Sequence, residues 1–321
     1  MTPRPTLSVL IVAYRTRDEL EALLPTIPAA AGSLTHEVVV VDNASGDGTV
    51  EWLGKAHPEV SVLALDENIG FARGVNLAAE RAAGEYLLLL NPDTLARPHA
   101  FEHLVRFARE HPGAGLVGGR TLTETGETEP SCCWGRPTLW SAFCFATGLT
   151  TALRGHPVLD PESLGGWDRT TSREVGVVTG CLLLCSAATW ERLGGFDPRF
   201  FMYGEDTDLS LRAWKAGYRP AIAPEAEVVH TIGASSSVPA LRRIMILRGK
   251  ATVFRLHWRP SAARLGIALL VGGVGLRAGL GLLKRRLRGV VSADQEGWIG
   301  AWRARANWVG GYPDEEVEPF E

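Results

Sequence analysis

Several hallmarks of common protein classes are missing from this 321-residue sequence. The five cysteines are odd in number and include no CxxC pair, which argues against a zinc site and favours a reduced, cytosolic chain. The N-terminal apolar run lacks the small-residue cleavage site of a signal peptide, so we expect it to form a first strand. No repeat of fixed period occurs, which excludes solenoid and collagen-like architectures.

Glycine is missing at the place where a common nucleotide-binding motif requires it. The junction after the first predicted strand reads VAYRTRDEL, whereas a dinucleotide-binding Rossmann site needs glycines there so that the backbone can approach the pyrophosphate. The P-loop pattern GxxxxGKS/T does not occur either. A Rossmann oxidoreductase is therefore disfavoured, and a P-loop NTPase is excluded.

Acidic residues are absent from residues 228–293, a stretch that contains twelve lysines and arginines. The rest of the chain carries 21 basic and 36 acidic residues, so the net charge of −3 conceals a segregation of charge. Within this stretch an apolar run at 265–276 precedes a basic cluster at 284–288. The run of twelve residues is shorter than the roughly 20 that span a bilayer as a helix.

Apolar residues beside a basic cluster suit a segment that lies in the membrane surface, where each Lys or Arg adds about 1 kcal/mol against anionic lipid. The alternative is a glycine-rich helical hairpin in the core with a solvated basic end. We expect a first domain at 1–240 and a basic, mainly helical C-terminal segment at 241–321. We expect peripheral contact of this segment with an anionic membrane, and no nucleic-acid partner.

Apolar strand patterns alternate with helical patterns in the first part of the chain, at 7–14, 36–42, 60–66 and 85–91. Continuous apolar strands that are each followed by a helix predict an α/β fold with a mostly parallel central sheet and helices on both faces. Ligands of such sheets bind at the carboxyl ends of the strands. The polar positions there are therefore the first candidates for a site.

The stretch LLLLNPDT at 87–94 ends an apolar run on polar residues. The proline fixes the backbone at the strand exit, so that the carboxylate of Asp93 would point away from the core. A rigid carboxylate in that place suits a hard divalent cation, because Mg²⁺ uses one or two carboxylates together with substrate phosphates. The alternative is a simple turn that caps the next helix.

A second apolar run at 175–186 predicts another buried strand, and an amphipathic helix is predicted at 205–216, with Gly217 as its end signal. Three acidic residues lie in the first turn of that helix: Glu205, Asp206 and Asp208. Acidic residues there complement the helix dipole by about 0.3–1 kcal/mol each. This structural role needs no catalysis.

Seven stretches follow one another between residue 7 and about residue 236: VLIVAY, VVVVDNASGDGT, ENIGFARGVNLA, LLLLNPDT, VTGCLLL, GGFDPRFFMYGEDTDLSLRAWKAGY and VVHTIGAS. In this order they resemble glycosyltransferase family 2, and in particular its bacterial rhamnosyltransferase-like members. The resemblance implies a GT-A fold, a nucleotide-sugar donor, a divalent metal and inversion at the anomeric carbon of the sugar.

The resemblance places nine residues against the nucleotide sugar: Ala13, Tyr14, Asp42, Asn68, Gly70, Arg73, Asn76, Asn91 and Gly180. Asp42 would accept the imide N–H of a pyrimidine base, as an ionised carboxylate can. Its alternative role is to cap the turn that follows it. Arg73 would reach a phosphate, or would be an ordinary exposed helix arginine.

The metal ligands that the resemblance implies are Asp93 and His230, with Mg²⁺ or Mn²⁺ as the cofactor. Asn91 stands where the general family motif has a first Asp, so the site carries one carboxylate fewer. We therefore expect weak metal binding until the diphosphate of the donor completes the coordination. The alternative for His230 is a structural histidine at a strand end.

Asp206 matches the catalytic base of the family. In an inverting transfer, a carboxylate on the face opposite the leaving group accepts the proton of the attacking hydroxyl, which is worth about 10²–10⁴-fold in rate. Glu205 would support this base or bind the acceptor.

The favoured function is transfer of L-rhamnose from dTDP-rhamnose to a glycan or polyprenyl-diphosphate-linked acceptor in cell-envelope polysaccharide synthesis. The work would take place in the cytoplasm, at the inner face of the plasma membrane. The alternatives are transfer of galactose or N-acetylglucosamine from a UDP donor, and a non-catalytic subunit that binds a nucleotide sugar.

Overall fold

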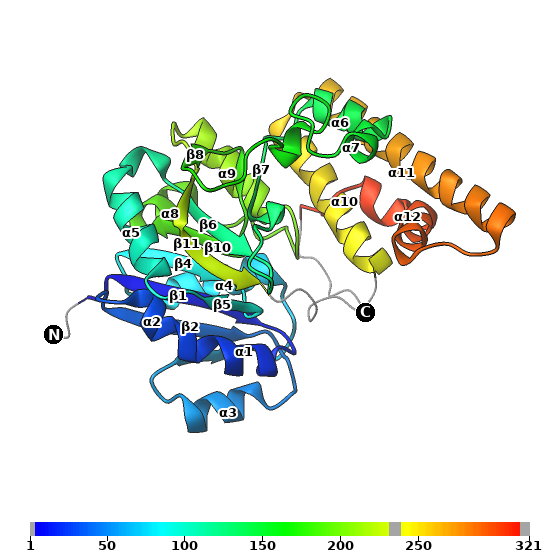
Figure 1. Cartoon of the computed structure of the whole chain (residues 1–321). Helices are drawn as coiled ribbons and strands as arrows, with labels where there is room; N and C mark the ends of the chain where they lie inside the picture. Colours follow the sequence, from blue (N-terminus) through cyan, green and yellow to red (C-terminus); the bar gives the residue numbers. More distant parts are fainter. Residues whose placement is uncertain (1–3, 231–238, 315–321) are drawn as a thin grey trace.

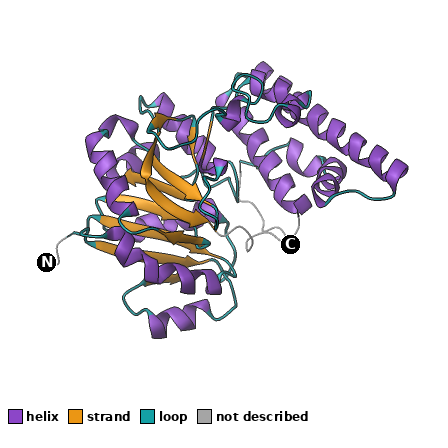
Figure 2. Ribbon diagram, in the orientation of Figure 1, coloured by secondary structure: helices purple, strands orange, loops and turns teal. Residues whose placement is uncertain are grey.

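The computed structural model describes residues 4–230 and 239–314. One large sheet forms the centre of the protein, with helices on both of its faces (Figure 2). A helical region made largely by the C-terminal residues lies beside the sheet (Figure 1). The predicted α/β class with a mainly helical C-terminal part is confirmed.

The described part of the chain places nine strands in this sheet, eight of them on one path in the order β3-β2-β1-β4-β10-β6-β11-β5. In that order their bounds are Ser61–Ala64, His36–Asp42, Leu7–Ala13, Tyr86–Leu90, Leu182–Ser186, Val117–Leu122, Ala221–His230 and Thr94–Ala96. The ninth strand, β8 (Arg173–Glu174), pairs with β11. The four strands from β3 to β4 are parallel, whereas β10 is antiparallel to both of its neighbours, so the sheet is mixed.

The four predicted N-terminal strands correspond closely to β1 to β4. The single strand predicted at 175–186 is wrong, because the chain forms two strands there, β9 (Val177–Val178) and β10. β9 pairs with β7 (Cys133–Trp134) outside the main sheet. Thr179, which lies between β9 and β10, donates to the carbonyl of Cys132 through its backbone N–H and its hydroxyl. These bonds direct the backbone away from the main sheet at this point.

Each face of the sheet is covered by its own set of helices. The first face packs on α1 (Arg17–Leu23), α2 (Ile27–Ala31), α3 (Thr49–Ala56) and α5 (Ala100–Glu110). The second face packs on α4 (Phe71–Arg81), α8 (Ala187–Leu193) and α9 (Glu205–Lys215). Alternate residues of β1 divide between the two cores, with Val9 and Ile11 in the first and Leu10 and Val12 in the second.

The C-terminal helices continue the second of these two cores. They are α10 (Pro239–His257), α11 (Pro260–Arg288), α12 (Ala293–Arg303) and α13 (Ala306–Val309), and they pack with α6 (Leu139–Ala146) and α7 (Leu149–Ala152), as Figure 1 shows. Trp308 and Tyr312 are buried within this core. The Tyr312 hydroxyl donates to the carbonyl of Met202 at 2.6 Å, which connects the segment after α13 to the loop before α9.

Helix α11 is one continuous helix of 29 residues, so the alternative of a helical hairpin is wrong. Its glycines allow close packing, because a Cβ on Gly266 or Gly273 would collide with the ring of Trp258 or Phe145. Within the described residues it is the one helix long and apolar enough to cross a membrane by length and composition. The expectation that this segment is too short is therefore corrected, although 39% of its most apolar 18-residue window is buried in the protein.

Candidate active site

Asp42 ends β2 beside Ala13, the last residue of β1, at the carboxyl edge of the parallel strands. Its Oδ2 accepts the backbone N–H of Ser45 at 3.2 Å, which is the turn-capping role. Its Oδ1 is buried and has no hydrogen-bond partner among the described residues. One carboxylate can therefore hold the turn and still offer an acceptor to a bound base. Tyr14, the next predicted residue, is 41% exposed at the same edge.

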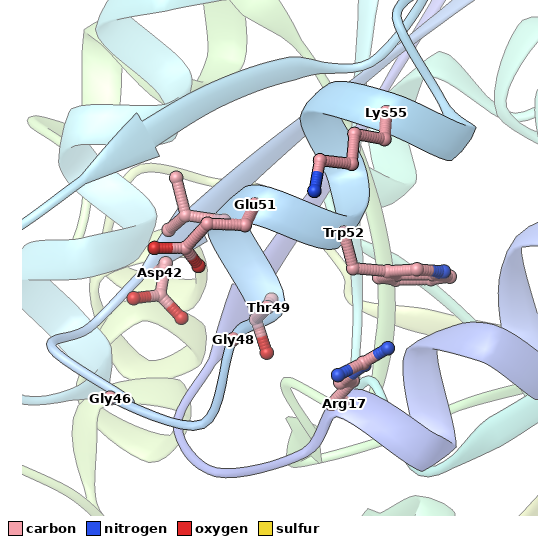
Figure 3. Close-up of a pocket in the computed structure, with 9 residues that line it drawn as sticks. Arg17, Asp42, Gly46, Gly48, Thr49, Glu51, Trp52 and Lys55 are labelled. Atoms are coloured by element: carbon pink, nitrogen blue, oxygen red, sulfur yellow. The ribbon is translucent and has the colours of Figure 1, made fainter.

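A pocket of about 480 Å³ opens beside Asp42. Figure 3 shows the loop at Gly46 and Gly48 on one side of it and the helix that carries Trp52 on the other. The guanidinium of Arg17 lies 5.9 Å from the centre of the Trp52 ring. The sequence did not single out these two residues, because an arginine and a tryptophan in the first turns of two helices carry no motif of their own.

Asn68 and Asn43 fix the loop that precedes α4. The Nδ2 of Asn43 donates to Oδ1 of Asn68 at 2.9 Å, and that oxygen also accepts the N–H of Gly70. The Oδ1 of Asn43 accepts the N–H of Ile69 at 2.9 Å. Asn43 was not among the predicted residues, although it directly follows Asp42. Both side chains hold the backbone of this loop, so together they fix the shape of the loop before α4.

Three further predicted residues, Gly70, Arg73 and Asn76, contact a second loop, at 196–201. Gly70 adopts a φ of +85°, and a Cβ there would lie 2.4 Å from the carbonyl oxygen of Phe201. Asn76 clamps the backbone of Phe196 with two 2.9 Å hydrogen bonds, and the Nε of Arg73 donates to the carbonyl of Pro198 at 3.0 Å. The structure therefore shows these side chains bracing the loop that leads towards α9.

Asp93 and His230 are brought together by strands that are far apart in sequence. β5 and β11 pair in antiparallel register with Thr94 opposite His230, which places the histidine next to Asp93. The Nε2 of His230 lies 3.3 Å from Oδ2 of Asp93. The hydrogen bond to Asp93 is the main cause that raises the pKa of His230. The predicted metal ligands are thus in contact with each other.

Asn91 contributes through its backbone to the shape of this edge. Its N–H donates to the carbonyl of Cys181 at 3.0 Å, and its carbonyl accepts the hydroxyl of Thr94 at 2.7 Å. These bonds fix both ends of the Asn-Pro-Asp turn. The turn therefore has a structural role, and it also positions the carboxylate of Asp93. The two interpretations of this stretch are compatible.

The side chains at this position fit a divalent cation in their chemistry. A carboxylate oxygen and an imidazole nitrogen are ligands that Mn²⁺ and related cations accept. Across the described ranges, no group of three His, Cys, Asp or Glu side chains is arranged to hold a metal by itself. Asp93 and His230, which lie in contact, thus remain the predicted pair of protein ligands.

Glu205 and Asp206 begin α9, directly after Gly204, which adopts a φ of +105°. Oδ1 of Asp206 accepts the N–H of Thr207 at 2.6 Å, and the N–H of Gly180 also donates to this carboxylate. Burial raises the pKa of Asp206 in spite of these donors. Gly180, predicted on the nucleotide-sugar side, is thus placed against the predicted base.

Glu205 is buried, and its Oε2 has no hydrogen-bond partner in the described structure. Burial and then the charge of Asp206 raise the pKa of Glu205 to about 8. The two neighbouring carboxyl groups thus both favour their protonated forms more than free carboxyl groups do. Asp208 differs from both, because it pairs with Arg212 at 2.6 Å and with His257 at 2.7 Å and has a lowered pKa.

Tyr203 connects the two acidic clusters. It has a φ of +68°, and burial is the main cause that raises the pKa of its phenol. The charges of Glu205 and Asp93 add to this shift. The backbone brings Asp206 and Asp93 to one region of the sheet edge, because the N–H of Gly180 donates to Asp206 and the carbonyl of the next residue, Cys181, accepts the N–H of Asn91.

The fold defines the class of protein. The mannosyltransferase PcManGT from Pyrobaculum calidifontis, solved in complex with GDP-Man and Mn²⁺, superposes with a TM-score of 0.55 and 19% identity, over 95% of this chain and 88% of that chain. S. aureus TarS 1–349 superposes with a TM-score of 0.53 and 18% identity, over 96% and 81% of the two chains. This likeness shows the fold, which is the GT-A fold of glycosyltransferases.

The family follows from two family models. Glycosyl transferase family 2 matches residues 8–147, and Glycosyl transferase family group 2 matches residues 164–257. The chain belongs to glycosyl transferase family 2 and is a glycosyltransferase with a nucleotide-sugar donor. It is 29% identical over 250 residues to the N-acetylglucosaminyl-diphospho-decaprenol L-rhamnosyltransferase of Mycobacterium tuberculosis, which covers 70% of this chain and 75% of the relative.

Proposed function

We propose that this enzyme transfers L-rhamnose from dTDP-rhamnose to a hydroxyl of a polyprenyl-diphosphate-linked glycan in cell-envelope polysaccharide synthesis. The mycobacterial relative supports both the sugar and the lipid-linked acceptor, since its name states both. The observation that carries the chemistry is that the N–H of Gly180 donates to Asp206 while the carbonyl of the adjacent Cys181 accepts the N–H of Asn91, which brings the proposed base close to Asp93 and His230. Galactose or N-acetylglucosamine from a UDP donor is the alternative.

Asp206 is the proposed base of an inverting transfer. In its ionised form it accepts the proton of the acceptor hydroxyl while that oxygen attacks the anomeric carbon, opposite the leaving diphosphate. Its raised pKa brings its basicity closer to the operating pH. The pKa of Glu205 beside it is also raised, which favours a protonated Glu205 as the partner of the base. The amides of Gly180 and Thr207 hold the carboxylate in place.

Asp93 and His230 are the proposed ligands of a divalent cation, Mg²⁺ or Mn²⁺. When bound, the cation would neutralise charge that develops on the departing diphosphate. Two protein ligands leave most of the coordination to the donor, so we expect tight metal binding only with the nucleotide present. Asp42, with its buried Oδ1, is the proposed acceptor for the N–H of the base.

A comparison of donors tests the sugar. In a thermal-shift series with Mn²⁺, bound donor raises the melting temperature by mass action, so the tightest donor at equal concentration gives the largest shift. We expect dTDP-rhamnose to give a larger shift than UDP-galactose or UDP-N-acetylglucosamine. A larger shift with either UDP-sugar would overturn the proposed donor in favour of the alternative.

Helix α11 supports a location at the inner face of the membrane. Its buried side packs on the protein, whereas one apolar side is exposed at Leu265, Leu276, Leu280, Leu283 and Leu287. These residues recur at helical spacing along one stripe, and the stripe ends in the basic cluster at 284–288. We propose that this stripe lies in the leaflet surface while the basic cluster meets anionic lipid.

Vesicle flotation tests this contact. A double variant, Leu280→Glu with Leu287→Glu, should lose most binding to vesicles that contain phosphatidylglycerol, because both side chains are exposed and their change does not disturb the core. Ala22→Glu with Ala29→Glu makes the same charge change on exposed positions of the first face and should bind like the natural protein. Equal flotation of both double variants would refute the membrane contact.

A further inference from the structure

Glu129 lies on the far side of His230 from Asp93. Its Oε2 is 3.0 Å from Nδ1 of His230, the ring nitrogen that does not face Asp93. Its side chain is 13% exposed. The N–H of Glu129 donates to the carbonyl of Thr121 at 2.8 Å, and Thr121 is in register with Val228 of β11. The sheet itself thus holds Glu129 against the histidine.

We propose that Glu129 is a positioning residue that orients His230 for the divalent cation. When Nδ1–H donates to the carboxylate of Glu129, the neutral ring that a cation requires keeps its hydrogen on Nδ1, and Nε2, the nitrogen beside Asp93, is left with its lone pair for the cation. Such a partner fixes both the tautomer and the rotation of a ligating imidazole. This inference rests on the proposed metal role of Asp93 and His230, and it adds a residue that no sequence motif marks.

The neighbouring ion pair between Arg120 and Glu227 provides a matched comparison. It joins β6 and β11, the strand that carries His230, and both side chains are partly buried. Glu227 is a carboxylate on the same strand as His230, paired with arginine instead of the histidine. A purely structural role for Glu129 predicts the same result for Glu129 and Glu227. A positioning role predicts that only Glu129 affects the metal.

The experiment is an Mn²⁺ titration of the full chain with dTDP present, followed by electron paramagnetic resonance of the free ion. We expect Glu129→Ala to weaken Mn²⁺ binding about 10–100-fold, as for other outer-shell partners. Glu129→Gln should recover most of this loss, because its amide oxygen also accepts Nδ1–H. Glu227→Gln should bind Mn²⁺ like the natural protein.

His230→Ala and the double variant with Glu129→Ala separate the possible failures. If Glu129 acts through His230, the double variant binds Mn²⁺ no more weakly than His230→Ala alone. Additive losses would overturn the positioning role, as would unchanged binding by Glu129→Ala when His230→Ala is impaired. Unchanged binding by His230→Ala would instead refute the proposed metal site itself. Melting temperatures without metal identify any variant that fails to fold, and Glu129→Gln then decides the question.

Discussion

Two acidic clusters lie near one region of the sheet edge, and their surroundings are opposite. Asp93 and Glu129 lie on the two sides of the His230 ring, so that a basic group separates two carboxylates. Glu205 and Asp206 are neighbours in the first turn of one helix, where burial raises the pKa of both. On the proposed function, the first cluster binds the cation and the second accepts the proton of the acceptor hydroxyl.

This difference shows how one residue type can serve two purposes in one site. The pKa of a carboxyl group follows its burial and its neighbours. A carboxylate beside an imidazole is suited to a cation, whereas a buried carboxylate beside a protonated partner is suited to accept a proton. We therefore predict that changes in the two clusters will separate donor and metal binding from the chemical step.

The largest effect should come from Asp206→Asn. Removal of the base should lower the rate of sugar transfer about 10²–10⁴-fold, because the acceptor hydroxyl loses its proton acceptor. Affinity for the donor with Mn²⁺, measured by calorimetry, should stay close to that of the natural protein. Loss of donor binding in this variant would show that the second cluster is not confined to proton transfer.

Glu205→Gln should change the pH dependence of stability. The folded-state pKa of Glu205 is about 8, above its usual 4.5, so between these values the folded protein holds a proton that the unfolded chain releases. The stability that this group contributes is therefore present at low pH and is lost as the pH rises towards 8. Glutamine cannot ionise, so the variant should gain roughly 1 kcal/mol relative to the natural protein for each pH unit in this window.

Urea denaturation at pH 5, 6.5 and 8, chosen within that window, checks this prediction. Asp42→Asn is a useful control, since it removes a carboxylate on the donor side away from the pair in α9. A stability difference that is the same at all three pH values would mean that Glu205 is ionised in the folded protein throughout.

His230→Ala should lower donor affinity at least about 10-fold in the presence of Mn²⁺, and should have little effect in its absence. The reason is that the variant loses a metal ligand, whereas direct contacts to the nucleotide remain. Calorimetric titration of dTDP with and without Mn²⁺ measures both affinities. Equal losses under the two conditions would point to a direct contact between His230 and the nucleotide.

The smallest effect should come from Tyr312→Phe, outside both clusters. This change leaves the carbonyl of Met202 without its hydrogen bond from the C-terminal region and should cost about 1 kcal/mol of stability. Because Met202 lies in the loop directly before α9, whose first residue is Glu205, a modest loss of transfer rate should accompany it. Chemical denaturation and transfer assays under identical conditions test both effects. An unaltered free energy of unfolding would show that this bond does not stabilise the loop.

The strands and the acidic residues at their ends could be predicted because their signals are local. Four apolar runs gave β1 to β4, with Asp42 as the last residue of β2 and Asp93 three residues after the end of β4. The role of a side chain was harder to predict than its place. Asn76 lies where the family pattern puts it, yet its amide bonds to the backbone of Phe196, 120 residues away. A motif fixes a position in sequence, whereas a contact depends on the whole fold.

Glu129 and the C-terminal helices could not be predicted for the same physical reason. Glu129 sits in an irregular stretch, and its partner His230 is 101 residues away. In α11 the glycines that allow close packing also obscure the helical period, so a hairpin and a single helix looked alike in the sequence. Neither outcome can be read from neighbouring residues alone.

The stereochemistry of transfer tests the central claim most directly, namely that Asp206 acts opposite a diphosphate held at Asp93 and His230. Proton NMR of the first-formed glycoside would give its anomeric configuration. The account predicts a product whose configuration is inverted relative to the donor, because the hydroxyl attacks from the face of Asp206 in one displacement. A product of retained configuration would contradict it.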